Sequence, residues 1–109
     1  MVKASPELVE RFEQLVDVVP EADRKLVFGS PTCLVAGNMF FGVHPTGLFV
    51  KLPPDAAEEL LAVGGSVFTP MPGRPMGGFY VLPEGEDTAD WVRRSYEFAL
   101  TLPAKKAKR

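Results

Sequence analysis

Apolar residues recur every three or four positions over residues 6–19, which is the spacing of one face of an α-helix. Ser5 can cap the N-terminus of this helix, because a serine hydroxyl accepts a hydrogen bond from an amide of the first turn. Pro6 suits the first helical position, and Pro20 ends the pattern. The sequence therefore predicts an amphipathic helix with one buried stripe, formed by Leu8, Phe12, Leu15 and Val19.

Between residues 25 and 52 the pattern changes to short apolar segments separated by turn residues. Gly37-Asn38 suits a two-residue hairpin turn, and Pro45-Thr46-Gly47 suits a three-residue hairpin loop. Connections this short make neighbouring strands antiparallel. The predicted strands are residues 25–28, 32–36, 39–44 and 48–52.

A second helix is predicted to begin at Pro53-Pro54-Asp55 and to end at Gly64-Gly65, where glycine can adopt the left-handed cap conformation. Glu58 and Glu59 fall on its polar side. Its inward positions are predicted to be Ala57, Leu60, Leu61 and Val63.

Two more strands and a third helix complete the predicted elements. The strands are residues 66–69 and 78–82, on either side of a turn that contains Arg74. Asp87-Thr-Ala-Asp90 resembles a capping box with Asp in place of Glu, and Pro103 ends the helix that follows. The shared face of this helix is predicted to carry Trp91, Ser95, Phe98 and Leu102.

The resulting order is α-β-β-β-β-α-β-β-α, with helices separating two groups of antiparallel strands. This order predicts an α+β fold, a two-layer sandwich in which helices cover one face of an antiparallel sheet. At 109 residues the chain is long enough for one domain with its own core. We expect this domain to span residues 1–104 and a disordered basic tail to follow at 105–109.

Charge is unevenly placed along the chain, although the net charge is only −2. Four of the twelve cations lie in the last five residues, so the rest of the chain is acidic. An acidic domain repels phosphate over most of its surface, which disfavours general nucleic-acid binding. Weak nucleic-acid association through the tail stays open as an alternative, with Lys105, Lys106, Lys108 and Arg109 as the contact residues.

No apolar run follows the N-terminal lysine, so the sequence predicts no secretory signal and a cytoplasmic location. Residues 26–50 contain no Asp, Glu, Lys or Arg, but several glycines and prolines interrupt them. Such breaks exclude a membrane-spanning helix, and an open sheet is not tolerated in lipid. We therefore expect no membrane partner.

Few residues are of the types that carry out catalysis. His44 is the only histidine, which excludes a histidine-based triad or a multi-histidine metal site, and its hairpin position predicts that it faces water. Cys33 is the only cysteine and sits in an apolar strand, which favours a packed thiol over a nucleophile. The carboxylates fall on solvated helix faces or in the 84–87 loop. We expect no catalytic residue, metal or cofactor.

Arg74 is the one charged residue that the sequence singles out. It lies between Pro72 and Pro75, which gives the guanidinium a stiff base, and the amides of Gly73, Gly77 and Gly78 could help it hold an anion. Alternatively, Arg74 pairs with an acidic side chain or only keeps the turn soluble, and the residue pattern favours this alternative.

Aromatic residues alternate along the predicted strands, so about half of them must point away from any single sheet face. A face without helices would leave an aromatic patch exposed, and such patches mark partner surfaces. The alternative is that a second protomer covers the face, which predicts a homodimer. The residues concerned are Phe40, Phe41, Phe49, Phe79 and Tyr80.

Between Phe28 and Ala99 the chain resembles the N-terminal domain of the TfoX/Sxy family. The resemblance implies a compact α+β domain with an antiparallel sheet, and it implies no catalytic residues. It is carried jointly by Phe28-Gly29, Asn38-Met39-Phe40, Gly47-Leu-Phe-Val-Lys51, Phe68, Gly73-Arg-Pro-Met76, Phe79-Tyr80-Val-Leu-Pro83 and Trp91-Val-Arg93.

Family members with two domains regulate bacterial competence and are thought to act with a transcription factor of the cyclic-AMP receptor type. This chain departs from that pattern, because it ends after the predicted third helix and has Ser30 where a second glycine is expected. We therefore expect a stand-alone, non-enzymatic interaction module of the TfoX N-terminal type, acting through protein–protein contact. The alternative is a small anionic-ligand binder or enzyme centred on the Arg74 turn.

Overall fold

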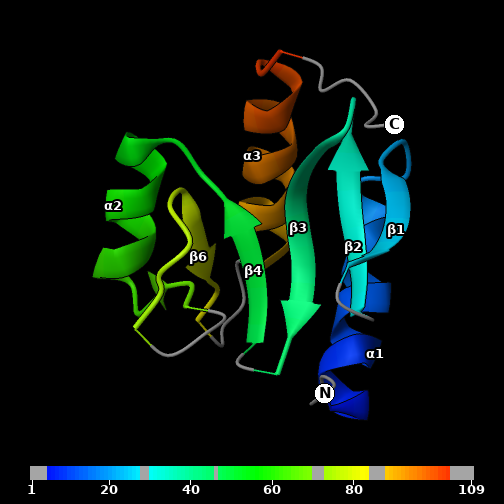
Figure 1. The fold of residues 1–109 in the computed structure, drawn as a ribbon, viewed down its shortest axis with the longest axis horizontal. Coiled ribbons are helices and arrows are strands. Elements are labelled where there is room, and N and C mark those ends of the chain that lie inside the picture. Colours follow the sequence, from blue (N-terminus) through cyan, green and yellow to red (C-terminus); the bar gives the residue numbers. More distant parts are fainter. Residues whose placement is uncertain (1–4, 28–29, 46, 70–72, 84–87, 104–109) are drawn as a thin grey trace.

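The computed structural model describes residues 5–27, 30–45, 47–69, 73–83 and 88–103 (Figure 1). One antiparallel sheet has the strand order β1-β2-β3-β4-β6-β5. The helices are α1 (Pro6–Leu15), α2 (Pro54–Ala62) and α3 (Thr88–Leu100), with a short 3-10 helix at Val16–Val18. The strands are β1 (Asp23–Val27), β2 (Ser30–Val35), β3 (Asn38–His44), β4 (Gly47–Lys51), β5 (Ser66–Val67) and β6 (Phe79–Val81).

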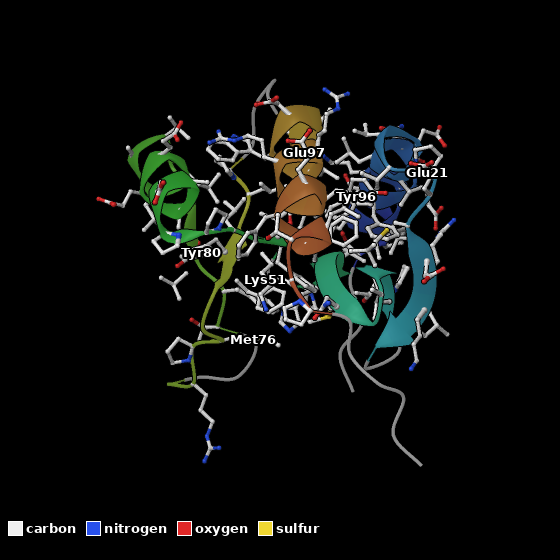
Figure 2. The ribbon with its side chains drawn as sticks, turned by 90° about the horizontal axis from the view of Figure 1, so that it is seen from above. Glu21, Lys51, Met76, Tyr80, Tyr96 and Glu97 are labelled. Atoms are coloured by element: carbon white, nitrogen blue, oxygen red, sulfur yellow. The ribbon has the colours of Figure 1, made fainter. Side chains whose placement is uncertain are left out.

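All three helices pack on the same face of the sheet, as Figure 2 shows from above. Phe12 of α1, Leu60 of α2 and Val92 of α3 are fully buried in one apolar core. Leu48 and Val50 of β4 enter the same core from the sheet. The predicted α+β architecture, with helices on one face of an antiparallel sheet, is confirmed.

The start of α1 follows the predicted capping chemistry. The Ser5 hydroxyl accepts a hydrogen bond from the amide of Leu8 at 3.2 Å, and Pro6 occupies the first helical position. Phe12 is the fully buried residue of the helix, and its ring stacks on Phe41 of β3 at 4.8 Å between centroids. The predicted apolar stripe of α1 is therefore the surface that contacts the sheet.

A β-bulge in β3 directs two consecutive aromatic rings toward the helices. Cys33 pairs with Phe41 and Leu34 pairs with Met39, so Phe40 is an extra residue between them. In a bulge, two residues oppose one, and the strand turns locally. Phe40 then contacts Tyr96 of α3 while Phe41 stacks on Phe12 of α1, and both Phe40 and Phe41 are fully buried.

Ser95 of α3 compensates for hydrogen bonds that the bulge interrupts. The register of β3 and β4 ends at Phe41 and Val50, and the amide of Lys51 lies one residue beyond it. This amide donates to the Ser95 hydroxyl at 3.2 Å, and the hydroxyl lies 2.8 Å from the carbonyl of Phe40 and 2.7 Å from that of Lys51. A buried backbone group needs such a partner.

The inward positions predicted for α2 are partly wrong. Leu60 is fully buried and Ala57 nearly so, but Leu61 is 42% exposed and Val63 is 60% exposed. The helix contributes only a narrow stripe to the core, which Ala56 extends, and Leu61 lies about 100° around the helix from Leu60. The predicted glycine cap is confirmed, because Gly64 has a positive φ and Gly65 donates to the carbonyl of Leu60.

The first predicted hairpin turn is displaced by one residue, and the second predicted loop is one residue too long. The turn between β2 and β3 is Ala36-Gly37, both with positive φ, and Asn38 already pairs with Val35 as the first residue of β3. Asn38 is buried and its amide donates to the carbonyl of Pro103 at 2.9 Å, which holds it in the strand. Likewise Gly47 pairs with His44 and belongs to β4.

β5 is shorter than the predicted strand 66–69. The carbonyl of Phe68 accepts from the amide of Met76 at 2.8 Å, so the chain leaves the strand after Val67 and folds back on itself. This return places Phe68 and Met76 against the sheet face that carries none of the described helices.

Candidate functional site

The face of the sheet without helices has its own small aromatic core. Phe49 of β4 and Phe79 of β6 point to this side, and Phe68 from the β5–β6 connection lies on them. The Phe68 ring stacks on Phe49 with 4.3 Å between centroids and 10° between planes, while Phe79 meets Phe49 edge-on at 5.9 Å. Such stacked and edge-on pairs add to the stability gained by burial.

Gly42 makes room for this stack. It pairs with Phe49, and the Phe49 ring crosses over it so closely that an added Cβ would lie 2.6 Å from the Phe49 Cζ. The ring cannot move away easily, because Phe68 covers its other side. The glycine in the centre of β3 is therefore a packing requirement rather than a source of backbone flexibility.

The exposed aromatic patch predicted from strand alternation is not found. Phe49, Phe68 and Phe79 are 5%, 3% and 6% exposed, so the chain covers its own rings. Phe40 and Phe41 both go to the helix side because of the bulge, and Tyr80 packs against the helix-side core. Burial of these rings removes the exposed patch on which a covering second protomer was predicted.

Half-buried apolar side chains surround the aromatic stack instead. Met39 of β3 and Met76 of the β5–β6 connection pack against it without being buried themselves. Leu34 pairs with Met39 and lies between two residues that face the helices, so it also points to this side.

Cations lie on the same side as these apolar residues. The Lys51 ammonium lies 5.2 Å from the centre of the Phe79 ring. Lys25 of β1 is exposed and pairs with Thr32, which in turn pairs with Gly42. Figure 2 shows Lys51 and Met76 on the side of the sheet away from the helices. We call the surface formed by Lys25, Leu34, Met39, Lys51 and Met76 the outer sheet face.

Arg74 is exposed on the β5–β6 connection, two residues before Met76. It forms no ion pair with another described residue, so the predicted return onto an acidic side chain is not seen there. Gly73 and Gly78 have positive φ, and the amide of Phe79 donates to the carbonyl of Met76 across Gly77-Gly78. These glycines therefore form turns that aim the chain back into β6.

Several predicted features lie outside the described residues. They include Pro72, the acidic 84–87 loop with the predicted capping box, and the tail residues Lys105, Lys106, Lys108 and Arg109. The prediction of nucleic-acid association through the tail therefore stays a prediction.

Burial shifts the pKa values of both His44 and Cys33 away from their ordinary values. His44 is half-buried with its ring edge-on to Phe68 at 5.1 Å, and loss of water around it lowers its pKa. His44 is thus partly exposed to water and partly covered by Phe68. Burial raises the pKa of Cys33 to about 11, so at neutral pH it is a packed, uncharged thiol, as predicted.

A shallow cleft of about 470 Å³ lies where the first turn of α1 meets the ends of β4 and β6. Sequence reasoning missed it, because its walls come from segments far apart in the chain. Arg11 and Glu7 both line it, so its charges offset each other and it does not select an anion. Its lining residues are Ser5, Glu7, Leu8, Arg11, Gly47, Leu48, Leu82 and Pro83.

Within the described part of the chain, no group of three or more His, Cys, Asp or Glu side chains is placed to hold a metal ion. No helix of that part is long and apolar enough to cross a membrane.

Sequence reasoning also missed the residues of the outer sheet face as a group. The alternation Phe49-Val50-Lys51 is nevertheless a signal that Lys51 shares the face of Phe49.

These features define a small α+β domain with one helix-covered and one helix-free sheet face. The sequence profile of the TfoX N-terminal domain matches residues 13–99 of the 109, and the chain belongs to this family. Neither a curated protein nor a solved structure shows significant similarity to the chain.

Proposed function

We propose that this domain is a non-enzymatic interaction module that binds a protein partner through the outer sheet face. The observation that carries the proposal is the combination of half-buried Leu34, Met39 and Met76 with the cations Lys25 and Lys51 on a face that no helix covers. Interface centres favour methionine, because its flexible thioether adapts to different partners. A module that acts by contact is compatible with a regulatory role.

The aromatic stack supports this proposal by giving the face a rigid base. Phe49, Phe68 and Phe79 are buried within the domain, so partner binding does not require them to rearrange. A preorganised surface loses less conformational entropy on association. The adaptable side chains are then confined to the two methionines and the lysines.

Site-directed photo-crosslinking in cells tests the proposal. A photoreactive phenylalanine analogue is placed at Lys25 or Arg74 on the outer side, and at Arg93 or Glu97 on α3 as matched exposed controls. We expect one discrete crosslinked protein species from the outer positions and none from the α3 positions. Equal crosslinking from both sides, or crosslinks only from α3, would refute binding through the outer sheet face.

A further inference from the structure

The acidic side chains of the described residues lie almost entirely in the helical layer. Figure 2 shows Glu21 and Glu97 on the helix side of the sheet. Asp23, at the start of the edge strand β1, is the exception, since it shares the side of Lys25. The acids of the helical layer and of the segment before β1 are Glu7, Glu10, Glu13, Asp17, Glu21, Asp55, Glu58, Glu59, Asp90 and Glu97.

The outer sheet face has the opposite charge. Lys25 on β1 and Lys51 on β4 are three strand spacings apart, which is about 14 Å. Leu34 and Met39 lie on the two strands between them. Arg74 adds an exposed cation on the connection that carries Met76. Asp23 of β1 pairs with Leu34 and is the one acid on this side among the described residues, so the three cations around the apolar strip outnumber it.

We infer that the partner docks on the outer sheet face through an acidic segment that also carries apolar side chains. The inference rests on the proposed function and names the chemistry of the partner. Leu34, Met39 and Met76 offer the apolar contacts, and the cations attract carboxylates of the segment. Charge complementarity of this kind raises the association rate and suppresses basic partners.

The same observations disfavour two other occupants. Single-stranded nucleic acid binds by stacking its bases on exposed rings, but Phe49, Phe68 and Phe79 are buried. A second copy would have to place its acidic helical layer on this face. That contact joins two different surfaces, so it cannot form a twofold dimer and would give a ring or an open filament instead.

Fluorescence anisotropy with labelled synthetic peptides tests the inference. The probes are a short peptide that alternates Glu or Asp with Leu or Phe, the same peptide with Lys at every acidic position, the same peptide with Ser there, and oligothymidylate. We expect saturable binding of the acidic peptide alone, weakened at high salt because the contacts are exposed. Tight binding of the lysine or serine peptide would overturn the inference.

Two double variants locate the binding. Lys25→Glu/Arg74→Glu reverses cations on the outer side, and Arg11→Glu/Arg93→Glu changes the net charge equally on the helical layer. Since each reversal removes an attraction and adds a repulsion, reversal of two exposed cations should weaken binding of the acidic peptide about tenfold. The control variant should bind within about twofold of wild type.

Each remaining outcome also decides the inference. Equal weakening by both double variants would mean that only net charge matters, and oligothymidylate binding that is lost in Lys25→Glu/Arg74→Glu would assign the face to nucleic acid. Self-association of the protein without peptide in analytical ultracentrifugation, lost in Lys25→Glu/Arg74→Glu, would assign the face to a second copy. If no peptide binds, the inference fails, while crosslinking from Lys25 and Arg74 still decides the proposed function separately.

Discussion

At the scale of single residues, packing on the outer side of the sheet depends on a glycine in β3. Gly42 lets the Phe49 ring lie across β3, and Phe68 then closes over that ring at 4.3 Å. The ring is thus held between backbone and aromatic partner. Met39 and Met76 pack at the edge of this stack, so the shape of the outer sheet face depends on Gly42 as well.

Gly42→Ala should lower the free energy of unfolding by about 1–3 kcal/mol, because the new methyl group overlaps the Phe49 ring and forces it against Phe68. Gly77→Ala is the matched control, since an added Cβ there meets nothing within 4 Å. Urea denaturation of both variants measures the difference. Similar losses in the two variants would show that Phe49 is free to move away from Gly42.

The burial of His44 should make the free energy of unfolding depend on pH. Its folded pKa is lowered by burial beside Phe68, while in the unfolded chain it returns to about 6.5. Below that pH the unfolded chain binds a proton that the folded chain resists, so folding stability falls as the solution becomes more acidic. Well above the unfolded-state pKa, His44 is neutral in both states and does not destabilise the fold.

Melting temperatures at pH 7 and pH 5 measure this effect in wild type and His44→Gln. From pH 7 to pH 5 the melting temperature of the wild type should fall further than that of the variant, since glutamine does not titrate. An identical loss in both proteins would mean that burial does not disfavour the charged imidazole.

At the scale of the elements, the bulge in β3 and the position of α3 depend on each other. Ser95 is fully buried and supplies the hydrogen bonds that Lys51 and Phe40 do not make across the strands. Helix α3 is therefore fixed to the sheet at the point where the ladder is interrupted. This contact also sets the position of Lys51, whose side chain reaches the outer sheet face.

Ser95→Ala should lower the free energy of unfolding by about 1–3 kcal/mol, because it leaves buried backbone groups without a partner. The exposed Thr101→Ala is a suitable control, since its hydroxyl bonds only to the carbonyl of Phe98 near the end of the helix. Thermal or urea denaturation reads out both. A negligible effect at Ser95 would mean that water takes over its hydrogen bonds.

The sequence pattern predicted the number, type and order of these elements, because helical and strand periodicities differ clearly. It missed the turn at Ala36-Gly37 because an alanine with positive φ gives no signal in the sequence. The bulge at Phe40 was missed as well. A shift of one residue moves every following side chain to the other face, so these two features decided where the aromatic rings point.

At the scale of the whole molecule, the domain has an acidic helical side and a basic, apolar sheet side. The strand pattern contained part of this division, since Phe49 with Lys51 and Phe79 with Val81 alternate visibly. It did not contain the rest. Contacts between segments that are distant in the sequence decide which face receives the helices. Such contacts also decide that Phe68 folds back over the other face.

The most direct test of partner binding through the outer sheet face is methyl NMR of protein labelled at methionine and leucine. Titration with the acidic peptide should shift the methyl signals of Leu34, Met39 and Met76 with one common saturation curve. The exposed methyl groups of Leu61 on α2 and Leu100 on α3 should stay unchanged. Shifts confined to Leu61 and Leu100, with the outer methionines unaffected, would contradict the proposed surface.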